Sequence, residues 1–248
     1  MHCSIVIPVL NEQANISPLI NEIDRAIQNK AAFEVIFVDD HSSDHTYAEI
    51  TRLQSRFPWL RVMQLPRQSG QSSALYHGVK HARYPMIVTL DGDGQNDPAD
   101  IARLLEVYVQ TVGKEPVKPV FCLVNGHRVQ RKDSGWRRFS SYVANSVRRF
   151  LLGDATPDSG CGIKAFSRDC FLALPRFDHM HRFLPALARQ SGALVVSVPV
   201  NHRVRMSGKS HYNTMGRLSV GLVDLVGVFW LGRRSIEPNL STGDANDS

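Results

Sequence analysis

The chain has 248 residues, 43% hydrophobic and 21% charged, so it can bury a sizeable core and is not a collagen, a coiled coil or a wholly disordered protein. Its formal net charge of +6 favours anionic partners, which include nucleic acid, an anionic membrane surface and phosphorylated ligands. Four cysteines without a C-x-x-C pair indicate reduced thiols, as in a cytosolic protein.

Residues 1–97 alternate between predicted strands and predicted helices. Continuous apolar runs indicate buried strands, and apolar residues three and four positions apart indicate helices. This alternation predicts an α/β fold, with a mostly parallel sheet and helices on both of its faces. Strands are expected at Cys3–Val9, Phe33–Val38, Leu60–Leu65 and Met86–Leu90, and helices at Asn15–Gln28, His45–Arg56 and Ser72–Ala82.

Polar residues follow the predicted strands at the edge where such sheets bind ligands. Asp91 and Asp93 come just after the run Met86–Leu90, and two carboxylates this close suit a divalent cation. Glycines beside them let the backbone turn sharply, although Asp and Gly are also ordinary turn residues. The other polar residues at strand ends are Asn11, Glu12, Asp39, Asp40 and Arg67.

The second half of the chain continues the pattern less regularly. A helix is expected from Asp97-Pro98 to about Thr111, because proline is favoured at the first helical position. A loop at Gly113–Pro119 and a strand at Val120–Asn125 follow. The remaining expected elements are helices at Trp136–Leu152 and His181–Gln190, strands at Ile163–Phe166 and Leu194–Val198, and a basic loop at Arg203–Tyr212.

A basic stretch runs from Arg128 to Arg149, with seven Lys or Arg residues against one acid, Asp133. It fits a solvated helix face, a nucleic-acid surface, or a site for an anionic acceptor such as a lipid phosphate beside an anionic membrane. Aromatic stacking positions and known nucleic-acid motifs are missing from it, so nucleic acid is not an expected partner.

The last predicted helix, Met215–Leu231, is apolar nearly all round and is followed by Arg233 and Arg234. It fits a core helix, or an interfacial helix with Trp230 at headgroup depth and the arginines on lipid phosphates. No apolar run reaches the roughly 18 to 20 residues that span a bilayer. We therefore expect peripheral attachment at the cytoplasmic face of a membrane, helped by a small integral-membrane partner. A homo-oligomer is the alternative partner.

Several sequence blocks, in order along the chain, resemble family 2 glycosyltransferases of the GT-A fold. Within that family they are most similar to polyprenyl-phosphate sugar transferases of the dolichol-phosphate mannose synthase type. The resemblance runs from Ile5 to about Leu231. Its blocks are PVLNE at 8–12, VDDHSSDHT at 38–46, DGDGQ at 91–95, GHR at 126–128, SGCG at 159–162, HRFLPAL at 181–187 and RMSGKSHY at 205–212.

The resemblance assigns roles on the donor side. It implies that Asp91, Asp93 and Gln95 hold Mg²⁺ or Mn²⁺ beside the diphosphate of a nucleotide sugar. Family members commonly carry lysine before the tyrosine at 212, whereas this chain has His211, and Lys209 and Arg182 are further candidates near the diphosphate. The remaining implied nucleotide-sugar contacts are Pro8, Asn11, Glu12, Asp40, Arg67, Arg205 and Ser210.

On the acceptor side, the resemblance implies that Arg128 and a second arginine grip a lipid phosphate. The spacing leaves Arg131 and Arg138 both open as that second residue, and Ser141 and Asn145 would line the same groove. As a metal ligand, Asp93 is not expected to act as a base.

The implied reaction is inverting transfer from a UDP- or GDP-sugar to undecaprenyl or dolichyl phosphate, for cell-envelope glycan or lipid A type modification. The acceptor is already an anion, so no general base is needed, and Asp93, Arg128 and Arg205 are the expected catalytic residues. One alternative is transfer to a sugar hydroxyl with Asp158 as the base. Another is a non-catalytic membrane-recruitment subunit.

The expected domain organisation follows from these assignments. A glycosyltransferase domain covers residues 1–212, with a nucleotide-sugar half at 1–97 and an acceptor half at 98–212. A membrane-interfacial helix follows at 213–234. The polar residues 235–248 are expected to form a disordered tail.

Overall fold

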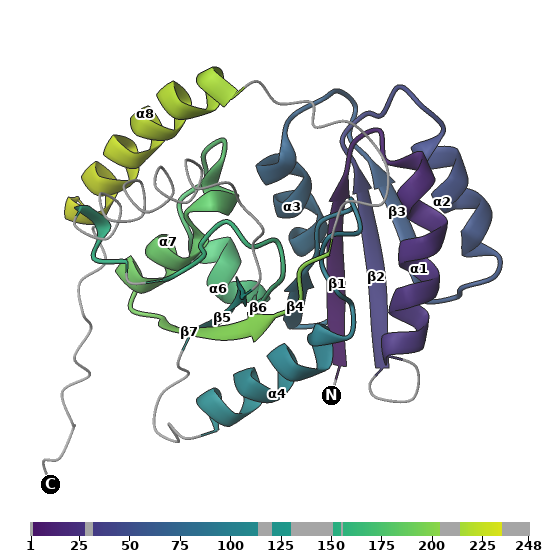
Figure 1. The fold of residues 1–248 in the computed structure, drawn as a ribbon, viewed down its shortest axis with the longest axis horizontal. Coiled ribbons are helices and arrows are strands. Elements are labelled where there is room, and N and C mark those ends of the chain that lie inside the picture. Colours follow the sequence, from purple (N-terminus) through teal and green to yellow (C-terminus); the bar gives the residue numbers. More distant parts are fainter. Residues whose placement is uncertain are drawn as a thin grey trace, which may run out of the picture.

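A single mixed sheet of seven strands organises the protein in the computed structural model (Figure 1). The structure describes residues 2–27, 32–113, 121–129, 151–154, 156–203 and 214–234, and in the last range it describes side chains from residue 221. The strand order is β3-β2-β1-β4-β6-β5-β7. Only β6 runs antiparallel to its neighbours, β4 and β5, so the predicted mostly parallel sheet is confirmed. The strands are β1 His2–Val9, β2 Ala32–Asp39, β3 Leu60–Gln64, β4 Met86–Thr89, β5 Cys122–Arg128, β6 Lys164–Ser167 and β7 Leu194–Val200.

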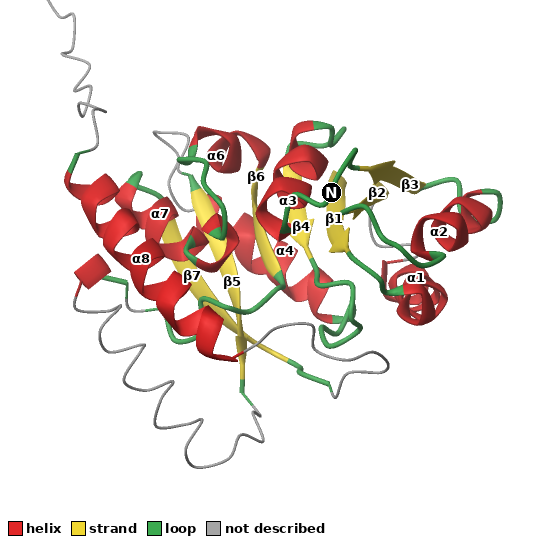
Figure 2. Ribbon diagram, turned by 90° about the horizontal axis from the view of Figure 1, so that it is seen from above, coloured by secondary structure: helices red, strands yellow, loops and turns green. Residues whose placement is uncertain are grey.

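Helices cover both faces of the sheet, as Figure 2 shows from above. One face packs against α1 Gln13–Ile27, α2 Thr46–Gln54 and α4 Asp100–Val112. The other packs against α3 Gln71–Lys80, α6 Arg168–Ala173, α7 Leu184–Gln190 and α8 Thr214–Arg233. A short 3₁₀ helix, η1 Met180–Arg182, lies between α6 and α7.

Each central strand contributes to two apolar cores. In β1, Ile5 and Ile7 belong to the core with α1 and α4, whereas Val6 between them belongs to the core with α3 and α6. All three side chains are fully buried. Burial on both faces explains why the strands read as unbroken apolar runs, which is the pattern that made them predictable.

The four cysteines are unpaired and buried. Cys3, Cys122 and Cys161 lie in the core that contains α1 and α4. Cys170 lies in the opposite core, beside α3 and α7.

Most predicted elements differ from the observed ones by one or two residues at their ends, and three differences are larger. The helix expected from His181 to Gln190 is instead η1 followed by α7, where Pro185 sits in the first turn because it lacks the N–H that an interior position needs. Helix α6 was not predicted; Ser167 caps it by accepting a hydrogen bond from the Cys170 N–H at 3.2 Å. Strand β5 includes Gly126 to Arg128, which were expected to follow it.

Three other predicted segments cannot be compared in full. The loop Gly113–Pro119, the helix Trp136–Leu152 and the loop Arg203–Tyr212 lie almost wholly outside the described residues.

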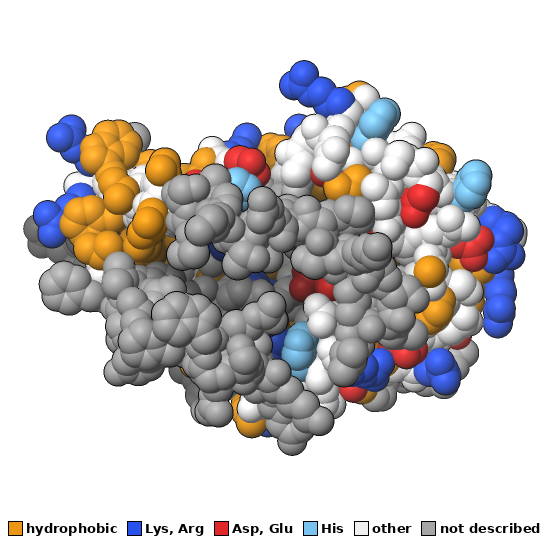
Figure 3. All heavy atoms as spheres, turned by 45° about the horizontal axis from the view of Figure 1, so that its top comes forward, with side chains coloured by type: hydrophobic (Ala, Val, Ile, Leu, Met, Phe, Trp, Pro, Cys, Tyr) orange, Lys and Arg blue, Asp and Glu red, His pale blue; other side chains and the backbone are white. Residues whose placement is uncertain are grey.

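Helix α8 is bound to the body on one side and carries apolar side chains on the other. Leu225 and Val228 are buried, and the Asp224 carboxylate lies 3.1 Å from His179 Nδ1. Figure 3 shows hydrophobic side chains gathered over this helix, with basic side chains beside them. The outward residues are Leu222, Val223, Val226 and Trp230, each more than half exposed. None of the described helices combines the length and the apolar composition needed to cross a membrane.

A buried carboxylate joins three strands at the amino end of the sheet. Glu34 on β2 is 2% exposed and accepts hydrogen bonds from Ser4 Oγ at 2.7 Å, Arg61 Nη1 at 2.6 Å and the Arg83 N–H at 2.5 Å. Burial acts to raise the pKa of Glu34, but these hydrogen bonds and the charge of Arg61 outweigh it and lower the pKa from its ordinary value of 4.5.

We expect Glu34→Gln to lower the free energy of unfolding at pH 7 by about 2 kcal/mol, because hydrogen bonds to a charged group are lost. Since the pKa of Glu34 is lower in the folded than in the unfolded state, its stabilisation is complete above the unfolded pKa and is lost as the pH falls through the folded pKa. The difference in the free energy of unfolding between wild type and variant, measured by urea unfolding, should therefore become smaller in acid.

Glu49→Gln is the matched control, because Glu49 pairs at 2.7 Å with an Arg52 side chain that is 65% exposed. Its urea midpoint should change much less than that of Glu34→Gln. Equal losses in the two variants would contradict a dominant role for burial.

Candidate functional site

The loops after β1 and β2 are joined by side-chain hydrogen bonds at the carboxyl edge of the sheet. Asn11 adopts a positive φ of 55°, and its Oδ1 accepts from the Ser43 N–H at 2.8 Å. The buried Asp39 accepts from Ser42 and from Gln64 Nε2, the latter at 2.8 Å. The loop ends in Asp44, whose Oδ1 accepts from the Thr46 N–H at 2.9 Å, where α2 begins.

Asp40 fixes the start of α3. Its Oδ1 accepts from the Ser69 N–H at 2.7 Å and its Oδ2 from the Gly70 N–H at 2.9 Å. Gly70 has a φ of +88°, a backbone conformation that glycine adopts without steric strain. Arg67, two residues before Ser69, is exposed at the same edge. The nucleotide contacts expected for Asp40 and Arg67 remain predictions.

The loop after β4 carries the three predicted cation ligands, and its own side chains shape it. Asn96 Oδ1 accepts from the Asp91 N–H at 2.9 Å, and Asp93 Oδ1 accepts from the Gln95 N–H at 3.1 Å. Gly94 between them has a φ of +74°. The turn therefore brings two carboxylates and a carboxamide to one short loop at the strand end.

Asp91 links this loop to α3 and has an unusual pKa. Its Oδ1 accepts from Gln71 Nε2 at 3.2 Å, one residue after the Gly70 that Asp40 holds. Burial, and then the like charge of Asp93, raise the pKa of Asp91 to about 6. A divalent cation between two such carboxylates would relieve their repulsion.

Lys164 supplies a buried positive charge that sequence reasoning missed. It is 3% exposed on β6, and its ammonium group donates to the Cys161 carbonyl oxygen. Burial lowers its pKa, while the negative charges of Asp91 and Asp158 oppose that shift. A lysine inside the apolar strand Ile163–Phe166 was the available signal.

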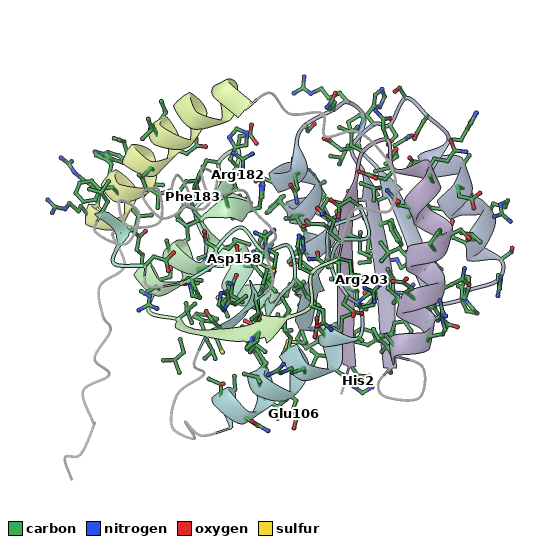
Figure 4. The ribbon with its side chains drawn as sticks, in the orientation of Figure 1. His2, Glu106, Asp158, Arg182, Phe183 and Arg203 are labelled. Atoms are coloured by element: carbon green, nitrogen blue, oxygen red, sulfur yellow. The ribbon has the colours of Figure 1, made fainter. Side chains whose placement is uncertain are left out.

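Arg128 and Asp158 form a bidentate ion pair beside Lys164. Arg128 Nε lies 2.6 Å from Asp158 Oδ2, and Nη2 lies 2.7 Å from Oδ1. Asp158 is only 8% exposed, and it lies within the half built from β5 to β7 (Figure 4). Such paired contacts fix the plane of the guanidinium group as well as its position.

The structure brings together one part of the predicted site. Asp40, Asp91, Asp93, Gln95 and Arg128 lie at the same edge of the sheet, and Pro8 and Glu12 lie at the end of β1. Arg182 is on η1. The other predicted residues lie outside the described part of the chain: Arg131, Arg138, Ser141, Asn145, Arg205, Lys209, Ser210 and His211.

The donor set suits a hard cation. Asp91, Asp93 and Gln95 offer oxygen ligands, which Mg²⁺ and Mn²⁺ prefer. Within the described ranges, no cluster of three or more His, Cys, Asp or Glu side chains could hold a metal ion. Water and substrate oxygens would complete the coordination, as is usual for Mg²⁺.

Gly162 leaves room for the Asp91 carboxylate. A Cβ atom built on Gly162 would overlap all three carboxyl atoms of Asp91. Thr89 Oγ1 donates a hydrogen bond to the Gly162 carbonyl oxygen at 2.7 Å, and this bond restrains the backbone from moving away from Asp91.

We therefore expect Gly162→Ala to displace Asp91 and to weaken Mn²⁺ binding by about tenfold to a hundredfold, the range found when groups that support a metal ligand are altered. Gly160→Ala is the matched control, because its Cβ would meet Arg128 Nη2 only at 3.8 Å and Asp158 Oδ1 at 4.0 Å. Calorimetric titration with Mn²⁺ measures both variants, and equal affinities would refute the steric argument.

Comparisons with known proteins indicate the family to which the chain belongs. The family model Glycosyl transferase family 2 matches residues 4–174. An undecaprenyl-phosphate 4-deoxy-4-formamido-L-arabinose transferase of Edwardsiella ictaluri (strain 93-146) is 33% identical over 226 residues, covering 90% of this chain and 66% of that protein. A dodecaprenyl-phosphate galacturonate synthase of Rhizobium johnstonii is 30% identical over 243 residues, covering 96% of this chain and 69% of that protein. The chain thus spans about two thirds of the length of these relatives.

Solved structures add evidence on the fold. Glucosyl-3-phosphoglycerate synthase from Mycobacterium tuberculosis, in complex with Mn²⁺, uridine diphosphate and phosphoglyceric acid, aligns with a TM-score of 0.68 and 20% identity. The alignment covers 96% of this chain and 80% of that one, which confirms the GT-A fold. Given the family match over residues 4–174, the chain belongs to glycosyltransferase family 2.

Proposed function

We propose that the protein transfers a sugar from a nucleotide-diphosphate sugar to a polyprenyl phosphate, with inversion at the anomeric carbon. The observation that carries this proposal is the Arg128–Asp158 pair, with contacts of 2.6 and 2.7 Å at the edge that holds Asp91. Asp158 is the carboxylate that a hydroxyl acceptor would need as a base. Because both of its oxygens engage Arg128, the site offers a fixed cation, which suits an acceptor that is already an anion.

The relatives support the acceptor class. The proteins from Edwardsiella ictaluri and Rhizobium johnstonii are named for undecaprenyl phosphate and dodecaprenyl phosphate. We extend that chemistry to this chain, with cell-envelope glycan or lipid A type modification as its setting.

On the donor side, Asp91, Asp93 and Gln95 hold Mg²⁺ or Mn²⁺ in this proposal. The cation supplies charge stabilisation for the diphosphate that leaves the sugar. Pro8, Asn11, Glu12 and Asp40 line the nucleotide pocket and Arg67 contacts a phosphate, while Arg205 and Ser210 bind the diphosphate. UDP- and GDP-sugars both fit this description.

On the acceptor side, Arg128 binds the lipid phosphate. Asp158 engages its Nε–H and one Nη2–H, and the guanidinium carries three further N–H groups for a ligand. A second arginine, Arg131 or Arg138, and Ser141 complete the pocket in this proposal. A phosphate oxygen then attacks the anomeric carbon as the bond to the diphosphate breaks, so catalysis consists of positioning and charge stabilisation.

Helix α8 is proposed to lie on an anionic membrane surface at the cytoplasmic face. Its outward apolar residues have no cover from the described chain, with Val223 72% exposed and Trp230 57% exposed. At its end, the Arg233 guanidinium lies 4.5 Å from the Phe229 ring centre, and Arg234 lies 5.8 Å from that of Trp230. Apolar groups flanked by arginines match the boundary between acyl chains and lipid phosphates. Transfer to a lipid acceptor requires that the enzyme lie close to the membrane that contains the lipid.

The acceptor assignment is tested by comparing Arg128→Ala with Asp158→Asn, after a thermal-shift screen of UDP- and GDP-sugars with Mn²⁺ has identified the donor. Arg128→Ala should reduce transfer to polyprenyl phosphate by about 100-fold or more, because a group that binds the attacking phosphate is lost. Asp158→Asn should reduce it less, since the guanidinium remains but is held more loosely.

Loss of transfer in Asp158→Asn alone would overturn the lipid-phosphate acceptor in favour of a sugar hydroxyl. Failure of the wild type to bind any nucleotide sugar with Mn²⁺ would instead favour the non-catalytic recruitment subunit.

The membrane contact is tested with the double variant Val223→Asp, Trp230→Asp and vesicles containing phosphatidylglycerol. We expect vesicle partitioning to fall at least tenfold in a sedimentation assay, because burial of each large apolar side chain is worth about 1.5–3 kcal/mol. Val109→Asp on α4 is the matched control, since Val109 is also exposed but lies away from α8 (Figure 1). Equal loss in the control, or no binding by the wild type, would contradict the proposal.

A further inference from the structure

The loop with the predicted cation ligands rests on the segment that follows β7. The Arg203 N–H donates to the Gln95 carbonyl oxygen at 3.0 Å, and Asn96 and His202 form an antiparallel bridge. Just before, the Asn201 N–H donates to Asp100 Oδ2 at 2.8 Å. The loop is therefore joined to residues more than 100 positions away by contacts that lie outside the strands of the sheet.

The Arg203 side chain strengthens this attachment by pairing with two carboxylates from different elements. Its Nη2 lies 2.6 Å from Asp97 Oδ1, at the end of the 91–97 loop, and its Nη1 lies 2.7 Å from Glu22 Oε2 on α1. The pair with Glu22 puts Arg203 beside α1, as Figure 4 shows. Two pairs on one side chain hold more firmly than one, because its rotamer freedom is lost only once.

The contact with Gln95 also sets the direction of its carboxamide. Gln95 Nε2 donates to the Arg203 carbonyl oxygen across a long 3.4 Å contact. A backbone carbonyl can only accept a hydrogen bond, so the group facing it must be the NH₂. The oxygen Oε1, the atom that a cation needs, is then turned away from Arg203.

We propose that Arg203 is a positioning residue for the divalent-cation site: it anchors the 91–97 loop and orients the Gln95 carboxamide so that Oε1 can serve as a ligand. This inference rests on the proposed function of Asp91, Asp93 and Gln95 as cation ligands. It adds a residue that lies outside the DGDGQ block and touches neither cation nor substrate.

An ordinary structural ion pair would stabilise the fold without affecting the cation. Arg61 provides that comparison, because its Nη1 lies 2.6 Å from the buried Glu34 at the opposite, amino end of the sheet. Both arginines are partly exposed, at 37% and 29%, and both bridge separate elements. Of these two arginines, Arg203 alone contacts the 91–97 loop.

The test compares wild type with Arg203→Met, Arg203→Lys and Arg61→Met in the full chain. Mn²⁺ affinity is measured by electron paramagnetic resonance, and the melting temperature of each variant is recorded. Arg203→Met should raise the Mn²⁺ dissociation constant about tenfold, as for residues that support a metal ligand, and Arg203→Lys should restore part of the affinity. Arg61→Met should lower the melting temperature without changing the dissociation constant.

Each outcome bears on the proposal. A dissociation constant within twofold of wild type in Arg203→Met overturns it, as does an equal rise in Arg61→Met. If the wild type itself fails to bind Mn²⁺, the proposed cation site fails and the role of Arg203 fails with it. If Mn²⁺ binding responds as expected but no sugar reaches polyprenyl phosphate, the proposed function fails while the positioning role stands.

Discussion

Compensation of buried charge at the carboxyl edge of the sheet is the constraint on which the site depends. Asp91, Lys164, Arg128 and Asp158 interact where β4, β6 and β5 meet. Each charge alone would be costly to bury, and together two acids and two bases offset one another. The reversed direction of β6 makes this possible, because it brings Lys164 into register between β4 and β5 at the edge where the other strands end.

The sheet was predictable because its strands are buried on both faces, and the candidate site was placed by where parallel strands end. Asp40 and Asp91 could be selected in this way, and the family blocks identified Arg128. Lys164 and Arg203 were not selected, since the contacts that draw attention to them are with partners far along the chain. Local sequence patterns do not record such pairings, and the antiparallel direction of β6 is equally invisible to them.

Helix α8 and the carboxyl edge of the sheet are connected through η1. Asp224 on α8 pairs with His179 at 3.1 Å, and two residues later His181 Nδ1 lies 2.8 Å from Ser72 Oγ in the first turn of α3. That same turn follows the Gly70 N–H bound by Asp40. The orientation of α8 is thus fixed relative to the start of α3, so any surface that receives α8 also receives the sheet edge at a defined angle.

The buried cysteines have a practical consequence. Burial raises the pKa of Cys3, Cys122 and Cys170 to about 11, so the reactive thiolate is scarce at neutral pH and alkylating reagents must wait for the chain to open. Because Cys3 and Cys122 lie in one core and Cys170 in the other, their labelling rates report separately on the two layers of the molecule. The native chain thus carries internal probes of which face loosens first.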